Sequence, residues 1–204
     1  AILVGHDSGS IHFLRKKEKI CKALDIGFRI AAHPASVSKA KLKKEIIRIV
    51  RDRNTAGVLI QLPLPSRLGN VQEFLDLVPK TKDVDVLGAE AFGDFALGGK
   101  PEPPVVGAMR FILEKYRIDS KGKQAAVVGA GRLVGRPIAL WFLNQGASVS
   151  VITEYTKNPA AFLRKADIVV SGTGKPGLVR GSMIKKGAVV IDFGYAVRGG
   201  KVRG

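Results

Sequence analysis

The sequence predicts an α/β protein with two βαβ domains, the second of them of Rossmann type. Short apolar runs alternate with amphipathic stretches along almost the whole chain of 204 residues, which is long enough for two cores. A Gly/Pro-rich segment at 98–104 interrupts this alternation and marks a domain boundary. A glycine-rich turn at 129–135 directly follows an apolar run, as in dinucleotide-binding folds. We therefore expect one domain over residues 1–104 and a second over 105–204.

The elements of the first domain follow from hydrophobic periodicity. Apolar runs predict parallel strands, and repeats at helical spacing between them predict helices that cover both faces of the sheet. The expected order is strand Ala1–Val4, helix Phe13–Leu24, strand Arg29–Ala32, helix Lys39–Arg53, strand Gly57–Leu62 and a helix near Val71–Val78.

The second domain shows the same alternation after a helix over Val106–Tyr116. We expect strand Ala125–Val128, helix Leu133–Leu143, strand Ser148–Ile152, a short helix Pro159–Lys165, and strands Ile168–Val170 and Val189–Asp192. Pro137 lies near the start of its helix, where proline is tolerated.

The chain is strongly basic, with a formal net charge of +17. The excess lies early, at 15–22 and 39–53, and indicates either an anionic partner or a solvated helix face. In the second segment the apolar residues form a separate core stripe, and no aromatic residues interleave with the cations as base stacking requires. Nucleic acid is therefore not the expected partner.

Cys21 is the only cysteine, so no disulfide forms within the chain, and its place on an apolar helical stripe is typical of a core residue. No run is long and apolar enough to span a bilayer, and no secretory pattern is present, so we expect no membrane association. A cytoplasmic location fits this cysteine usage.

The helix predicted at 13–24 carries a lysine on its apolar stripe. The apolar members of the stripe are Phe13, Ile20, Cys21 and Leu24. Lys17 lies four residues from both Phe13 and Cys21 and so shares their face. A lysine on an inward face costs free energy unless something uses it, which makes Lys17 a candidate functional group. The alternative is that its stem follows the edge of the core while the ammonium stays in water.

The turn after the strand Ala125–Val128 has the strand–turn–helix context of a phosphate-binding loop. Its residues are Gly129, Ala130, Gly131, Arg132, Leu133, Val134 and Gly135. The last glycine comes one residue later than in G-x-G-x-x-G, but the context favours a dinucleotide. Glu154 follows the next strand, where an acidic residue accepts both ribose hydroxyls and favours NAD over NADP. The alternative for Glu154 is an exposed loop charge.

Two loops of the first domain carry further candidates. Gln61 ends the third strand, before Pro63, at the sheet edge where α/β sites form. The segment Lys82–Asp85 (Lys-Asp-Val-Asp) holds two carboxylates two residues apart. A metal site is one interpretation, but no further ligands accompany the pair, and a turn with surface acids is the other.

Together, these motifs carry a resemblance that runs in order over essentially the whole chain. They are Gly5-His6-Asp7 with Ser10 and Lys17, Gln61–Pro65, Lys82–Asp85, the turn at 129–135 with Pro137, Gly174–Gly177 and Val190–Gly194. The chain resembles the bifunctional methylenetetrahydrofolate dehydrogenase/cyclohydrolases. The resemblance implies an N-terminal folate-binding catalytic domain and a C-terminal NAD(P)-binding domain. It also implies oxidation of 5,10-methylenetetrahydrofolate to 5,10-methenyltetrahydrofolate with NAD or NADP, followed by hydrolysis to 10-formyltetrahydrofolate.

The resemblance further implies a role for each site residue. Lys17 matches the central catalytic lysine, Gln61 the glutamine that orients it, and Asp85 the aspartate that grips the pterin. Phe13 joins them in the substrate site, and Tyr195 joins the glycine turn and Glu154 in cofactor binding. Tetrahydrofolate derivatives are the implied substrates and a homodimer the implied assembly. The early basic helices are expected to attract the glutamate tail of the folate.

In the first domain, the chain departs from the family pattern at three places. Phe13 stands where the family has a tyrosine, so the hydroxyl that accompanies the cyclohydrolase step is absent. Val86 replaces the glycine that follows Lys-Asp-Val-Asp, and Pro103–Val106 replaces a Pro-Cys-Thr-Pro loop.

The cofactor region also departs from that pattern. Ala130-Gly131 stands where the family often has Arg-Ser, which together with Glu154 favours NAD, although Arg132 and Lys157 are nearby cations. Relative to the family, the chain is expected to be shortened at both ends. The competing hypothesis is a non-catalytic relative that binds folate, nucleotide or RNA through its basic surface.

Overall fold

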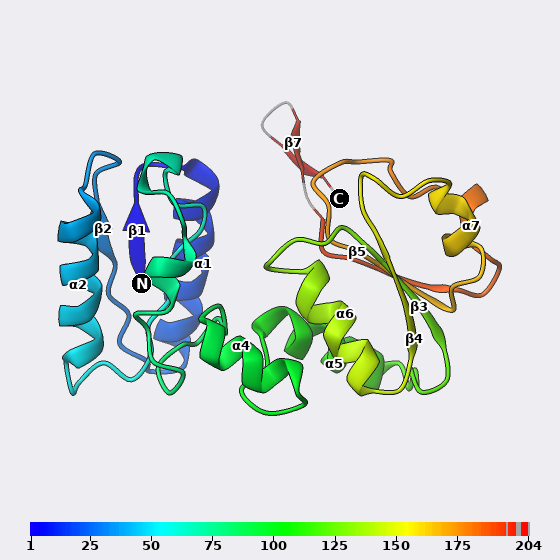
Figure 1. Cartoon of the computed structure of the whole chain (residues 1–204), viewed down its shortest axis with the longest axis horizontal. Coiled ribbons are helices and arrows are strands. Elements are labelled where there is room, and N and C mark those ends of the chain that lie inside the picture. Colours follow the sequence, from blue (N-terminus) through cyan, green and yellow to red (C-terminus); the bar gives the residue numbers. More distant parts are fainter. Residues whose placement is uncertain (195, 199–200, 204) are drawn as a thin grey trace. The chain divides into compact units, whose positions relative to one another are not determined.

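The computed structural model describes residues 1–194, 196–198 and 201–203. The chain divides into two compact units, Ala1–Gly93 and Asp94–Gly204. Both units combine parallel strands with helices, so the predicted α/β class is confirmed (Figure 1).

The first unit is built around a short parallel pair of strands. Its elements are β1 (Ile2–Val4), α1 (Ser8–Ala23), β2 (Ala31–His33), α2 (Lys39–Arg51), the 3-10 turn η1 (Ser66–Leu68), α3 (Gln72–Leu75) and the start of α4 (Ala89–Ala96). β1 pairs with β2 along one edge and forms a parallel bridge to Ile60 along the other. The predicted strand Gly57–Leu62 is thus an extended segment with isolated bridges rather than a regular ladder.

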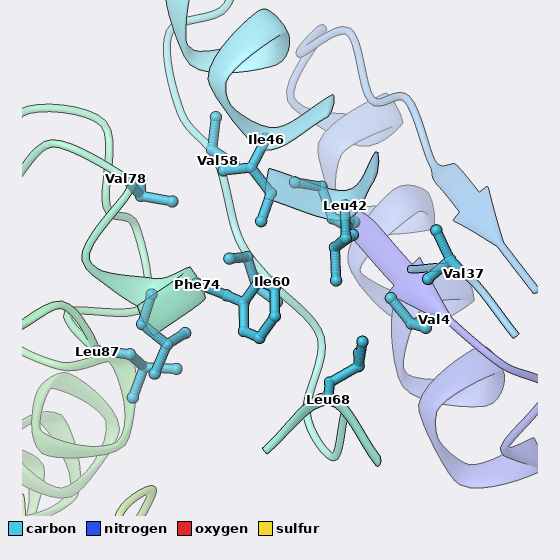
Figure 2. Close-up of a cluster of buried hydrophobic side chains, with 12 residues drawn as sticks. Val4, Val37, Leu42, Ile46, Val58, Ile60, Leu68, Phe74, Val78 and Leu87 are labelled. Carbon is cyan, nitrogen blue, oxygen red and sulfur yellow. The ribbon is translucent and has the colours of Figure 1, made fainter. Parts of the chain in front are cut away.

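Alternate residues of β1 face different helices. Ile2 and Val4 belong to the core cluster that includes the apolar face of α2, whereas Leu3 packs with Leu14 of α1. The strands therefore lie between α1 and α2, as Figure 1 shows. Figure 2 shows the larger cluster, whose labelled members are Val4, Val37, Leu42, Ile46, Val58, Ile60, Leu68, Phe74, Val78 and Leu87. Each fully buried side chain of this size contributes about 1.5–3 kcal/mol to folding.

Polar side chains cap the starts of both long helices. Asp7 is the N-cap of α1, and its carboxylate accepts a hydrogen bond from the backbone N–H of Ser10 at 2.7 Å. This bond lowers the pKa of Asp7. Ser38 caps α2 in the same way, through Lys41. α1 consequently begins at Ser8, ahead of the predicted start.

The apolar stripe predicted for α1 is wrong. Three of its members are largely exposed: Phe13 (50%), Ile20 (60%) and Leu24 (65%). The buried face instead carries Ser10 and Leu14, with Lys17 and Cys21 partly buried along the same line. The packing of Leu14 against Leu3 and Leu59 decides which face of α1 is buried. The larger number of apolar residues on the predicted stripe does not. Lys17 and Cys21 therefore lie on the inward face, while the other three members of the predicted stripe do not.

The second unit is a four-stranded parallel sheet with helices on both faces. Its elements are the end of α4, α5 (Pro104–Lys115), β3 (Gln124–Val128), α6 (Gly135–Asn144), β4 (Ser148–Ile152), α7 (Pro159–Leu163), β5 (Ile168–Ser171), the 3-10 turn η2 (Gly181–Met183), β6 (Val189–Asp192), β7 (Ala196–Arg198) and β8 (Lys201–Arg203). The strand order is β4-β3-β5-β6, and all three pairs are parallel. α6 packs on β3 and β4, while Leu163 of α7 joins a core cluster on the other face (Figure 1). The predicted Rossmann-type arrangement is confirmed.

Several elements differ from those predicted. α4 and the antiparallel pair β7–β8 have no counterpart in the sequence prediction. β2 starts two residues later and ends one residue later than the predicted strand Arg29–Ala32, and the helix near Val71–Val78 is reduced to α3. Within the described ranges, no helix combines the length and apolar character that crossing a membrane requires.

Candidate active site

In the first unit, the structure brings Lys17 together with Asp85. Lys17 Nζ lies 3.2 Å from both carboxylate oxygens of Asp85, and the two side chains are 23% and 21% exposed. The ammonium also lies 4.9 Å from the centroid of the Phe13 ring, within the range of a cation–π interaction. Three of the four predicted substrate-site residues thus form one cluster.

The segment Lys82–Asp85 uses its two carboxylates in different ways. Asp83 is buried, and its carboxylate accepts backbone N–H bonds from Leu87 and Gly88, whereas Asp85 pairs with Lys17. Across residues 1–194, 196–198 and 201–203, no three His, Cys, Asp or Glu side chains gather as a metal site. The surface-turn interpretation also fails for Asp83, because its carboxylate organises the turn from within.

Gln61 lies at the carboxyl end of the segment that flanks β1. Its backbone N–H donates to the carbonyl of Ile2 at 2.9 Å, which fixes it at the sheet edge as predicted. Its side-chain amide donates to the carbonyl of Leu62 at 2.8 Å, and the Ser10 hydroxyl of α1 donates to the same carbonyl at 3.3 Å. The expected bond from Gln61 to Lys17 is not among the hydrogen bonds of the described residues.

A groove of about 780 Å³ opens beside the Lys17–Asp85 pair. Its walls are largely apolar and include Cys21, Phe28 and Val84. Cys21, predicted to be a core residue, is therefore only partly buried.

In the second unit, the glycine turn connects β3 to α6 and is held tightly. Gly129 has φ +98°, a conformation that favours glycine, and its N–H donates to the carbonyl of Ile152 at 2.8 Å. A methyl group at Gly135 would overlap the carbonyl oxygen of Gly129. The turn therefore needs glycine at both ends.

The middle of the turn fits a phosphate group. No atom lies within 4 Å of where a Cβ of Gly131 would stand, so the backbone is open to close approach there. At the start of α6, the N-cap Val134 forms no side-chain cap bond, the Arg136 N–H donates to the carbonyl of Gly131 at 3.1 Å, and Pro137 has no N–H. The N–H of Gly135 is therefore the helix donor placed for an anion. Arg136 donates from Nε to the carbonyl of Ala130 at 3.0 Å and steadies the turn. Arg132 is partly buried and Leu133 is 49% exposed.

Glu154 lies in the loop after β4, next to the glycine turn in the sheet. β4 pairs with β3 so that Ile152 stands opposite Val128, and Glu154 follows two residues later, exposed. This is the relationship expected of a ribose-binding acid. Lys157 is exposed in the same loop. Tyr195, the remaining predicted cofactor residue, lies outside the described residues.

Sequence reasoning missed a cavity of about 220 Å³ at the carboxyl ends of β5 and β6. Its lining includes Ser171, Thr173 and Asp192. A Cβ on Gly129 would lie 3.0 Å from the Thr173 methyl group, so this cavity adjoins the glycine turn. The sequence did contain a signal for this cavity, because polar residues directly follow the apolar runs of β5 and β6. Parallel strands end at a common edge of the sheet, so such residues lie close together.

Comparison with known protein families gives two matches that together span most of the chain. Residues 1–85 match the family described as "Tetrahydrofolate dehydrogenase/cyclohydrolase, catalytic domain". Residues 103–204 match "Tetrahydrofolate dehydrogenase/cyclohydrolase, NAD(P)-binding domain". The Lys17–Asp85 cluster falls in or at the end of the first match and the glycine turn in the second.

Individual relatives agree with these matches. The "Bifunctional protein FolD" of Moorella thermoacetica is 39% identical over 195 residues, which cover 95% of this chain and 69% of that protein. The bifunctional FolD structure from Campylobacter jejuni superposes with a TM-score of 0.93 at 32% identity, covering 98% of this chain and 72% of that one. The Trypanosoma brucei enzyme, solved with NADP cofactor and inhibitor, gives 0.90 at 32% identity, covering 96% and 67%.

Proposed function

Since the chain belongs to the tetrahydrofolate dehydrogenase/cyclohydrolase family, we propose that it oxidises 5,10-methylenetetrahydrofolate with NAD(P) and hydrolyses the product. The first step gives 5,10-methenyltetrahydrofolate, and the second adds water to give 10-formyltetrahydrofolate. The observation that carries the proposal is the Lys17–Asp85 ion pair, in a chain that also has a glycine turn between β3 and α6.

Lys17 is the group that moves protons in this proposal. Its side chain is anchored along the inward face of α1 and partly screened from water, so it is held in one place. Water attack on the methenyl carbon requires removal of a proton, which a positioned amine can accept. Gln61, at the same sheet edge, is placed to orient Lys17 or the substrate once its amide leaves the Leu62 carbonyl.

Asp85 is the proposed anchor of the pterin. Its carboxylate can accept hydrogen bonds from a ring N–H and an exocyclic amine, which are strong because the acceptor is charged. A pterin bound in this way competes with Lys17 for the same two oxygens. Substrate binding would thereby loosen the ion pair and free the Lys17 amine for proton transfer.

The second unit binds the dinucleotide in this proposal. Gly129–Gly135 and the start of α6 receive the pyrophosphate, and Glu154 accepts the ribose hydroxyls. When bound there, the dinucleotide would supply the hydride acceptor for oxidation of the folate methylene group. Glu154 repels an added phosphate, so we expect NAD to be preferred, with Arg132 and Lys157 as the cations that would oppose this preference.

The remaining features complete the proposal. Residues 1–104 form the folate-binding catalytic domain and 105–204 the NAD(P)-binding domain. The enzyme works on tetrahydrofolate derivatives in the cytoplasm as a homodimer, without nucleic acid as a partner. The exposed cations of α1 and α2 attract the glutamate tail of the folate.

The direct test is formation of methenyltetrahydrofolate by the full protein, with NAD and with NADP. Lys17→Ala should lower the rate at which methenyltetrahydrofolate is hydrolysed by about 10²–10⁴-fold, the range for losing a positioned proton-transfer group. Lys115→Ala, exposed at the end of α5, is the control and should keep wild-type rates. Absence of turnover with either cofactor would refute the proposal. Salt-sensitive RNA binding in its place would support the non-catalytic alternative.

A further inference from the structure

Asp85 lies within a short loop, residues 82–88, that is fastened on both sides of it. We propose that Asp83 is a positioning residue of the reaction: its buried carboxylate folds this loop so that Asp85 faces Lys17. The inference rests on the proposed function of the Lys17–Asp85 pair.

The Asp83 carboxylate is buried and accepts two hydrogen bonds from the backbone of its own loop. Asp83 is 7% exposed, and its Oδ2 accepts hydrogen bonds from the backbone N–H groups of Leu87 at 2.9 Å and Gly88 at 2.8 Å. A buried carboxylate is costly unless it is hydrogen-bonded, and two charge-assisted bonds to backbone donors offset that cost. These bonds tie residue 83 to residues 87 and 88 and close a turn around Asp85.

The closed turn places a β-branched residue in an unfavourable conformation. Val86 has φ +55°, in the left-handed region that a valine rarely adopts, and its side chain is 1% exposed. Such a conformation persists only where the surrounding contacts over-determine it. Because Val86 directly follows Asp85, the turn that holds Val86 also fixes the backbone from which the Asp85 side chain extends.

The entrance of the loop is fixed independently. Lys82 Nζ donates to the carbonyl of Val50 at 2.8 Å and to that of Asp52 at 3.0 Å, at the carboxyl end of α2. The backbone of Lys82 accepts a bond from Val58 N–H at 2.7 Å. The loop is thus anchored before Asp85 by Lys82 and after it by the Asp83 turn.

Gly88 makes the Asp83 contact possible. A Cβ at this position would lie 3.2 Å from Asp83 Oδ2 and 3.3 Å from the carbonyl oxygen of Leu75. Gly88→Ala therefore weakens the same contact without removing the carboxylate, and it provides a second variant if Asp83→Asn does not fold.

The primary test measures the Lys17–Asp85 pair without any folate. The full protein is acylated with acetic anhydride at several pH values, and the modification of Lys17 relative to exposed Lys16 is measured by mass spectrometry. The Asp85 carboxylate lies against the Lys17 amine and restricts its approach to the reagent, so Asp85→Asn should raise the Lys17/Lys16 ratio by about threefold or more. Asp83→Asn should raise it toward the same value.

The control separates positioning from general stability. Asp76 also caps a backbone N–H, that of Ala89 at 2.7 Å, but it is exposed and does not adjoin Asp85 in the chain. Asp76→Asn should lower thermal stability without changing the Lys17/Lys16 ratio. All variants are compared well below their melting temperatures.

Kinetics provide the second readout. Asp83→Asn should raise the KM for the folate substrate about tenfold and leave the KM for NAD(P) within about twofold. The inference is overturned if Asp85→Asn raises the Lys17/Lys16 ratio and Asp83→Asn and Gly88→Ala do not, or if Asp85→Asn itself has no effect. An inactive wild-type protein would refute the proposed function instead, while the acylation ratios would still report on positioning.

Discussion

The Phe13 ring lies one turn before Lys17 on α1, and the Lys17 ammonium stands 4.9 Å from its centroid. The ring shields one side of the ammonium while Asp85 pairs with it. The Phe13 side chain has no hydroxyl group and therefore offers Lys17 no hydrogen bond. The family pattern has a tyrosine here, and the difference is a single oxygen atom beside the proposed proton-transfer group.

Phe13→Tyr should therefore accelerate the cyclohydrolase step. A hydroxyl beside Lys17 can hydrogen-bond to the amine or to the attacking water, and a gain of about 1.4 kcal/mol in the transition state corresponds to about tenfold in rate. Hydride transfer does not need this hydroxyl and should change by less than about twofold. The measurement is the ratio of the two rates. Phe13→Leu is the control, since it removes the ring without adding a hydroxyl, and an equal gain there would contradict the explanation.

Glu154→Gln should shift the cofactor preference toward NADP. The amide no longer repels the additional phosphate and accepts the ribose hydroxyls less strongly, so the ratio of kcat/KM for NADP over NAD should rise by about tenfold or more. Glu114→Gln removes an equal charge from an exposed position on α5 and should leave the ratio unchanged. A wild-type enzyme that already prefers NADP would show that the role assigned to Glu154 is wrong.

Gly135→Ala should destabilise the second unit and abolish dinucleotide binding. The added methyl group would overlap the Gly129 carbonyl, so the turn must open, at a cost on the order of 3 kcal/mol. Gly131→Ala is the informative partner, because no atom lies within 4 Å of its Cβ position. It should unfold in urea like the wild type yet bind NAD more weakly in calorimetry. Unchanged NAD binding in Gly131→Ala would place the phosphate elsewhere.

Asp167→Asn should change how stability depends on pH. The Lys185 ammonium, 2.6 Å away, and the backbone N–H of Gln124, 2.8 Å away, lower the pKa of Asp167. A lowered carboxyl pKa stabilises the folded state above the ordinary aspartate range, near pH 3.9, and this stabilisation is lost as the pH falls through the lowered value.

The variant should accordingly melt below the wild type at pH 7, and the difference should close as the pH falls below about 4. Differential scanning calorimetry at stepped pH measures this. Lys185→Met should weaken the same interaction, so the double variant should lose less than the sum of the single losses. A difference that stays constant down to pH 2.5 would contradict the assignment.

The second unit could be predicted well because its signals are local. β3, β5 and β6 are apolar runs bounded by polar or glycine residues, and each is found within one residue of its predicted position. The glycine turn could be recognised in the sequence because its backbone conformation and its contact with α6 both require glycine. The pair β7–β8 also had a signal, since Gly199 and Gly200 separate two short strand-like runs.

The first unit was less predictable because its decisive contacts are distant in sequence. Asp85 meets Lys17 across 68 residues, and no local pattern encodes that distance. The face of α1 that turns inward is chosen by the packing of Leu14 on the sheet, which left Phe13 exposed despite its apolar character. The different uses of Asp83 and Asp85 follow from the closure of their loop, which the spacing of two acids does not reveal.

The glycine turn also bears on how such sites are recognised in other sequences. Its third glycine stands one residue later than the common spacing, yet Gly135 still packs directly on the carbonyl of Gly129. A search that fixes the number of residues between glycines would discard this chain. A different search would retain this chain. It would test whether a side chain on the first residue of the helix would clash with the first glycine of the turn. Steric exclusion between two backbone positions is thus a more general descriptor of this class of turn than a letter pattern.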